Sequence, residues 1–133
     1  MDAPEDADAV GVLAREVERV ADRLRSMSDV RLGQPFPPTG TRALAALDLA
    51  QHLADAAQGV EERAAAVAPG LRVVPDVGVF ALGDQVAVTG TDLVVAAGGL
   101  RPEDVVWTAE GRAPLSQVLE GATQAVRALR QAL

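Results

Sequence analysis

The sequence predicts an α+β domain in which three amphipathic helices pack on a small antiparallel sheet. Three observations support this prediction: apolar residues recur every three or four positions in three stretches, residues 71–89 alternate in polarity with period 2, and Gly and Pro clusters separate these segments. The predicted order is ααβββ(α/β)βα. The 133 residues fit one domain, 1–133, with no internal repeat.

The first predicted element is an amphipathic helix near the N-terminus. Its apolar residues are spaced alternately three and four positions apart, which places them on one stripe. The opposite face is charged, so the stripe is the face that packs against the rest of the domain. The stripe consists of Val10, Leu13, Val17, Val20, Leu24 and Met27.

Residues 29–40 form a Pro-rich connecting loop. It contains a PxxP pattern around Phe36, a candidate interaction residue. Such a segment can dock as a polyproline II helix into a partner's aromatic groove. The simpler interpretation is a stiff spacer with Phe36 packed into the core.

A second helix is predicted to begin after a capping Thr39 or Thr41 and to extend to about Val67, where Ala68-Pro69-Gly70 ends it. Small side chains dominate its apolar seam, so another helix backbone can approach closely. That partner is the first helix, the last helix, or the same helix of a second copy. Ala50, Ala57 and Ala64 are therefore candidate interaction residues in a seam that also includes Ala46, Leu53, Val60 and Val67.

Three strands are then predicted at residues 71–74, 77–82 and 85–89, with Gly83-Asp84 as the two-residue turn of a hairpin. Residues 91–99 suit either a strand or a short helix, and their flanking caps favour the helix. A last strand at 105–107 and a turn at 109–112 follow. The final helix begins at Pro114, with the stripe Leu115, Val118, Leu119, Ala122, Val126, Leu129 and Leu133.

The composition excludes several chemistries. Cys, Lys, Ile, Asn and Tyr are absent and there is one His, a bias that indicates a GC-rich bacterial genome. Without Cys there is no thiol nucleophile or thiolate zinc site, and without Lys there is no P-loop. A single His excludes every two-His metal motif. We therefore expect no cofactor and no metal.

The charge pattern argues against nucleic acid and membrane partners. The net charge is −7, the arginines are scattered among acids, and there are three aromatic residues, too few for a base-stacking platform. The longest uncharged run, residues 32–41, contains three prolines, so no segment is expected to span a bilayer. The N-terminus is acidic where a signal peptide needs positive charge, which predicts a cytoplasmic protein.

One polar cluster contains residue types that can act in catalysis. Asp48 and Asp55 flank His52 at positions i−4 and i+3, which places all three on one helical face. Such a row is either a metal site or carboxylate-oriented base, or a solvated row of charges opposite the Ala seam. The second interpretation is favoured. Trp107, the single Trp, is a candidate binding anchor or a core residue.

These observations favour a non-enzymatic cytoplasmic accessory or interaction protein, which self-associates through its helices as a homodimer or binds a protein partner. The first alternative is a small-molecule binding module with an apolar pocket between sheet and helices. The second is a small enzyme that uses His52 and carboxylates.

Overall fold

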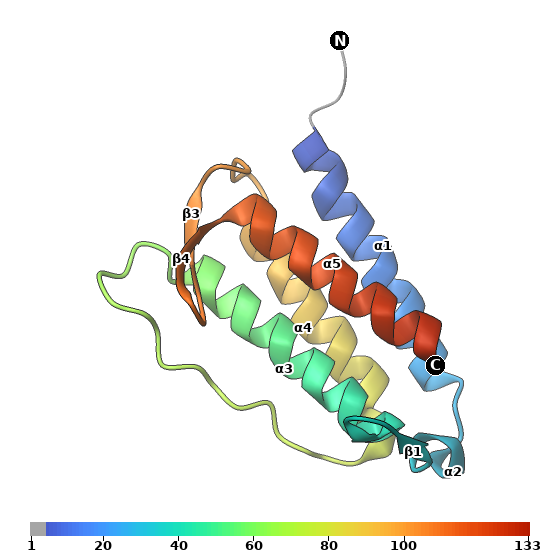
Figure 1. Cartoon of the computed structure of the whole chain (residues 1–133). Coiled ribbons are helices and arrows are strands. Elements are labelled where there is room, and N and C mark those ends of the chain that lie inside the picture. Colours follow the sequence, from blue (N-terminus) through green and yellow to red (C-terminus); the bar gives the residue numbers. More distant parts are fainter. Residues whose placement is uncertain (1–4) are drawn as a thin grey trace.

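The computed structural model describes residues 5–133 and shows an α+β fold dominated by helices (Figure 1). Four long helices form a bundle, and two short antiparallel hairpins lie at its ends. The elements are α1 (Glu5–Arg25), α2 (Asp29–Leu32), β1 (Pro35–Phe36), β2 (Gly40–Thr41), α3 (Arg42–Glu61), the 3-10 turn η1 (Val79–Ala81), α4 (Leu82–Ala97), β3 (Val105–Thr108), β4 (Gly111–Pro114) and α5 (Leu115–Ala132).

The bundle has one unusual connection. In Figure 1, α1 and α5 run in one direction and α3 and α4 in the other. Each of α1 and α3 packs against both α4 and α5. Because α3 and α4 are parallel neighbours, residues 62–78 must return along the length of the bundle between them. We call this connection the strap.

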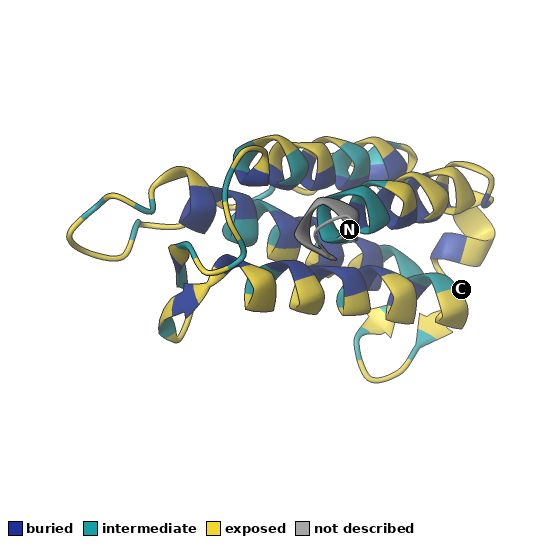
Figure 2. Ribbon diagram, turned by 90° about the horizontal axis from the view of Figure 1, so that it is seen from above, coloured by how far each residue is buried: buried dark blue, intermediate teal, exposed yellow. Residues whose placement is uncertain are grey.

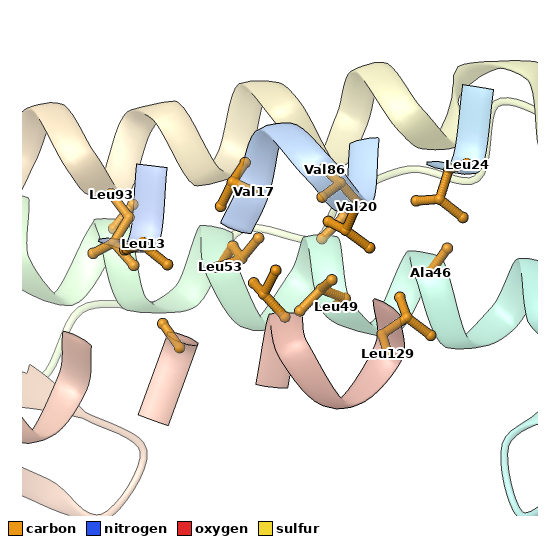
Figure 3. Packing of buried hydrophobic residues seen from close by; sticks show 14 of the residues in the cluster. Leu13, Val17, Val20, Leu24, Ala46, Leu49, Leu53, Val86, Leu93 and Leu129 are labelled. Carbon is orange, nitrogen blue, oxygen red and sulfur yellow. The ribbon is translucent and has the colours of Figure 1, made fainter. Parts of the chain in front are cut away.

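The predicted stripes of the first and last helices form the core (Figure 3). Leu13, Val17, Val20, Leu24 and Met27 of the first stripe are buried, and so are Leu115, Leu119, Ala122, Val126, Leu129 and Leu133 of the last. The second helix begins at Arg42, and Thr41, one of the two predicted caps, accepts a hydrogen bond from the Leu44 N–H at 3.1 Å. It ends at Glu61, six residues earlier than predicted.

The predicted hairpin at 77–89 is wrong, because this segment is η1 and the first half of α4. Gly83 lies inside the helix rather than in a turn. It belongs to a helical seam, Gly83, Val86, Gly90, Leu93 and Ala97, whose members are all buried. A Cβ at Gly90 would lie 2.5 Å from Cγ1 of Val17, and one at Gly83 would lie 2.9 Å from the carbonyl oxygen of Ala21. The glycines therefore let α1 and α4 pack closely, and that packing overrides the strand preference of the valines.

Of the other predictions for residues 71–114, one is wrong and the rest are confirmed. Residues 71–74 have no strand partner and belong to the strap. Residues 91–97 are helical, as favoured. The strand at 105–107 is confirmed as β3, and the turn after it is confirmed as the turn of the β3–β4 hairpin, with Gly111 at a φ of 111°. The sequence-based interpretation did not include β4, the strands β1 and β2, or the helix α2, which forms the first four residues of the predicted connecting loop 29–40.

Candidate functional site

The β3–β4 hairpin is fixed directly onto α3. Gly59 of α3 packs against the carbonyl oxygen of Trp107 so closely that a Cβ there would clash with it. The indole Nε1 of Trp107 donates to the Ala65 carbonyl at 3.1 Å. Arg112 lies over the indole ring, 3.8 Å from its centroid, and donates to the Arg63 and Ala65 carbonyls. The hairpin thus satisfies carbonyls just beyond the C-terminus of α3, where the helix ends.

A groove of about 630 Å³ lies between this hairpin, α3, α5 and the start of the strap. We call it the hairpin groove. Two of the predicted cluster residues, His52 and Asp55, line it together with Trp107 and Glu110. Asp48 is exposed and does not line it. Asp55 accepts a hydrogen bond from Nε2 of Gln51 at 2.7 Å.

The hairpin groove offers binding groups rather than an assembled reaction centre. His52 is exposed, and among the side chains of residues 9–133 no hydrogen bond orients its ring. No three His, Asp or Glu side chains in this part of the chain are grouped to hold a metal ion. General base catalysis needs a positioned base, so the groove as it stands supports recognition of a ligand.

The remaining predicted site residues lie elsewhere. Ala50 and Ala57 are buried inside the bundle, where α3 has its most extensive contact with α4. The close partner of the Ala seam is therefore a helix that the sequence-based interpretation assigned largely to strands. Ala64 lies beyond the end of α3 and is exposed. Phe36 is half-buried at the opposite end of the bundle, with the Arg42 guanidinium 5.7 Å from its ring centroid.

The strap is held by three glutamines that the sequence-based interpretation missed. Nε2 of Gln58 donates to the Gly70 carbonyl at 2.8 Å, and its Oε1 accepts from the Arg72 N–H at 3.1 Å. Gln51 binds the next backbone groups of the strap in the same way. Its Nε2 donates to the Arg72 carbonyl at 2.9 Å, and its Oε1 accepts from the Val74 N–H at 2.7 Å. Gln85 of α4 donates to the Pro75 carbonyl at 2.7 Å. The signal available in the sequence was two glutamines seven residues apart beside the Ala seam.

A second groove, of about 420 Å³, lies between the strap and α4. We call it the strap groove. Its walls carry Val73 of the strap and Val88 of α4, which are 83% and 60% exposed. The chain that joins the two walls adds Val77 and Phe80, which are 63% and 82% exposed. We call these four residues the strap face.

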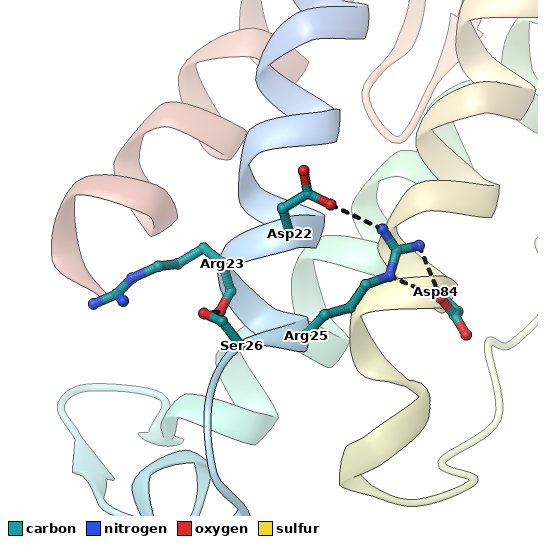
Figure 4. Close-up of polar contacts among 5 residues, drawn as sticks. All are labelled: Asp22, Arg23, Arg25, Ser26 and Asp84. Atoms are coloured by element: carbon teal, nitrogen blue, oxygen red, sulfur yellow. Dashed lines mark hydrogen bonds and ion pairs between the residues drawn. The ribbon is translucent and has the colours of Figure 1, made fainter.

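Carboxylates rim the strap groove. Glu61, Asp84 and Asp92 line it. Arg72 pairs with Glu61 at 3.7 Å, and Arg25 of α1 pairs with Asp84 at 2.8 Å. Figure 4 shows Arg25 lying between Asp84 and Asp22 and so linking the end of α1 to the start of α4. Within the described residues Asp92 forms no ion pair, so the rim has excess negative charge.

The helix behind the strap face is apolar beyond the needs of the core. By length and composition alone, Val79–Ala97 is suited to cross a membrane, and 28% of that apolar stretch is buried, whereas the core helix of a soluble protein is mostly buried. The uncharged runs of the sequence predict no such segment, because Asp84 and Asp92 divide this stretch into shorter runs. The burial colouring in Figure 2 shows exposed positions alternating with buried ones along the helices.

No family model, curated protein or solved structure matches this chain.

Proposed function

We propose that this chain is a cytoplasmic accessory protein that binds a protein partner through the strap face. The observation that carries the proposal is the exposure of Val73 and Val88, which line the strap groove from the strap and from α4, and of Val77 and Phe80 on the chain between them. Three glutamines hold the strap in place. An apolar groove with exposed valines and a polar rim is typical of protein interaction sites. A connection tied at both helices is a built surface rather than a loose loop.

The charge of the rim favours a protein over a membrane as the partner. Biological membranes that attract peripheral proteins by charge are anionic and recruit Lys and Arg. The strap groove instead carries three carboxylates, Glu61, Asp84 and Asp92, against one arginine, Arg72, and the whole chain has a net charge of −7. A partner with cationic and apolar side chains complements this face.

Site-specific photo-crosslinking in the source organism tests the proposal. A benzophenone amino acid replaces Phe80 in one variant and Gln124, an exposed residue of α5, in a matched control. We expect one dominant adduct with another protein from position 80 and none from position 124. Equal adducts from both positions, or no adduct from position 80, would contradict the proposal. An adduct between two copies would replace it with the homodimer expectation.

A second candidate function is small-molecule binding in the hairpin groove. Its volume is in the usual range for ligand sites, and it lies between a sheet and helices. His52, Asp55 and Glu110 surround an apolar wall that includes Trp107 and Val118. A metabolite panel screened by Trp107 fluorescence and thermal shift tests this function, because Trp107 is the only Trp. A catalytic use of His52 would require turnover of a compound found in that screen.

A further inference from the structure

The fold satisfies one edge of the strap backbone and leaves the other free. The Gly70 carbonyl, both backbone groups of Arg72 and the Val74 N–H are bound by glutamines of α3. In extended backbone, successive residues direct their N–H and C=O groups to opposite sides. Val73 lies between two residues that face α3, so its own backbone groups face away. Within the described residues, the backbone groups of Val73 and those of Leu71 make no hydrogen bond.

We propose that the free edge at Leu71 and Val73 accepts an extended segment of the partner protein as an added β-strand. This inference rests on the proposed function, because it specifies how the strap face is occupied. Strand addition obtains affinity from main-chain hydrogen bonds and specificity from pockets for alternate side chains. The strap supplies both, since its backbone is unpaired at this edge, Val73 lines the strap groove and Leu71 lines the hairpin groove.

The groove defines the chemistry of that segment. Val73 and Val88 offer apolar walls, and Asp92 on the rim is free of ion pairs within the described residues. A segment that alternates valine-like side chains with Lys or Arg places apolar groups against the walls and cations within reach of the carboxylates.

A second copy of the chain fits this edge poorly. Antiparallel pairing of two straps about Val73 places Leu71 opposite Pro75, which has no N–H to donate. It also brings together two faces of the same excess negative charge, which costs free energy. The occupant is therefore a different protein with a cationic, apolar segment.

The test uses the heptapeptide acetyl-Val-Lys-Val-Lys-Val-Lys-Val-amide as the probe. Its binding to the full chain is measured by calorimetry and compared with the same peptide methylated on every backbone nitrogen. Methylation removes the donors but keeps the side chains. We expect the methylated peptide to bind about tenfold more weakly or worse, as the loss of two or more hydrogen bonds implies.

A pair of variants tests the same edge from the protein side. Val73→Pro removes the free N–H and leaves the N–H and C=O groups held by the glutamines in place, whereas Val73→Ala keeps the N–H. We expect Val73→Pro to weaken binding of the unmodified peptide about tenfold and Val73→Ala to weaken it about threefold or less. Equal binding of the two peptides to the wild-type chain would overturn the inference even if Val73→Pro failed to fold. So would a lack of binding of the unmodified peptide, or full binding by folded Val73→Pro.

The two proposals fail separately. If crosslinking from position 80 captures a partner whose affinity is unchanged by Val73→Pro, the strap face is still the binding surface and strand addition is wrong. If position 80 captures no partner, the proposed function fails whatever the peptide does.

Discussion

The side-chain oxygen of Gln58 accepts a hydrogen bond from the backbone N–H of Arg72, a residue on the strap, at 3.1 Å. Gln58 is buried, and its amide nitrogen is used as well, by the Gly70 carbonyl. The position of the strap face thus depends on a polar side chain that the core tolerates because both ends of its amide are satisfied.

Replacing Gln58 with Leu should loosen the strap. The substitution removes two hydrogen bonds and leaves partly buried backbone groups unpaired, so we expect a loss of about 1–3 kcal/mol in the free energy of unfolding. Limited proteolysis between residues 66 and 78 should become faster. Gln124→Leu on the exposed face of α5 is the matched control and should change neither quantity. Unchanged proteolysis in Gln58→Leu would show that the strap is held by other contacts.

Gly90→Ala and Gly121→Ala should change the free energy of unfolding in opposite directions, because the two glycines have different surroundings. Gly90→Ala places a Cβ against Val17 and should destabilise the chain by about 1–3 kcal/mol through overpacking. Gly121 lies on α5 with no heavy atom within 4 Å of its built Cβ, so Gly121→Ala should stabilise by up to about 1 kcal/mol through helix propensity. Chemical denaturation measures both. A neutral Gly90→Ala would contradict the close packing of α1 on α4.

Glu16 should make stability fall in acid. This buried carboxylate of α1 lies 3.1 Å from Nε of Arg130 and 3.4 Å from Nε of Arg127 on α5. Burial raises its pKa, but the two arginines outweigh burial, and the pKa is lowered from 4.5. Because the folded pKa is below the unfolded one, the contribution is present above about pH 4.5 and is lost as pH falls through the folded pKa.

Comparison with Glu16→Gln isolates this effect. The variant should be less stable at pH 7, on the order of 2 kcal/mol, since it loses charged hydrogen bonds. Its stability should also decline less steeply than that of the wild-type chain below pH 4.5. Parallel pH profiles for the two proteins would exclude Glu16 as the source.

Arg112 should control the attachment of the hairpin to α3. Arg112→Met keeps much of the apolar stem but removes the donors to the Arg63 and Ala65 carbonyls and the cation over Trp107. We expect Trp107 emission to shift to longer wavelength and to become more accessible to acrylamide. Arg101→Met, in an exposed turn, provides the control. An unchanged spectrum would mean that Gly59 packing alone fixes the hairpin.

Much of the fold could be predicted because the apolar residues of α1 and α5 recur with helical periodicity. The stripe from Leu13 to Leu24 and the stripe from Leu115 to Leu129 combine a 3-4 spacing with a charged opposite face. The α4 segment does not, because Gly83 and Gly90 occupy seam positions and its outer face carries Val88 and Val95. Gly83 was interpreted as a turn residue, whereas in the structure its small size allows α1 to pack closely on α4.

The candidate site was predictable only in part. His52, Asp55 and Trp107 were singled out one by one from residue type, and their convergence on one groove depends on where Gly59 lets the hairpin settle. The strap face could not be found from local pattern, since alternating valines in residues 71–89 predict strands equally well. The backbone groups of the strap form hydrogen bonds with glutamine side chains rather than with a neighbouring strand. Such bonds produce no periodic pattern in the sequence.

Amide hydrogen exchange of the full chain, with and without the partner identified by crosslinking, distinguishes binding at the strap face from binding at the hairpin groove. We expect the partner to slow exchange at Leu71, Val73 and the first turns of α4, and to leave exchange at residues 107–118 unchanged. Slowed exchange confined to the hairpin groove, with no change along the strap, would contradict the proposed function.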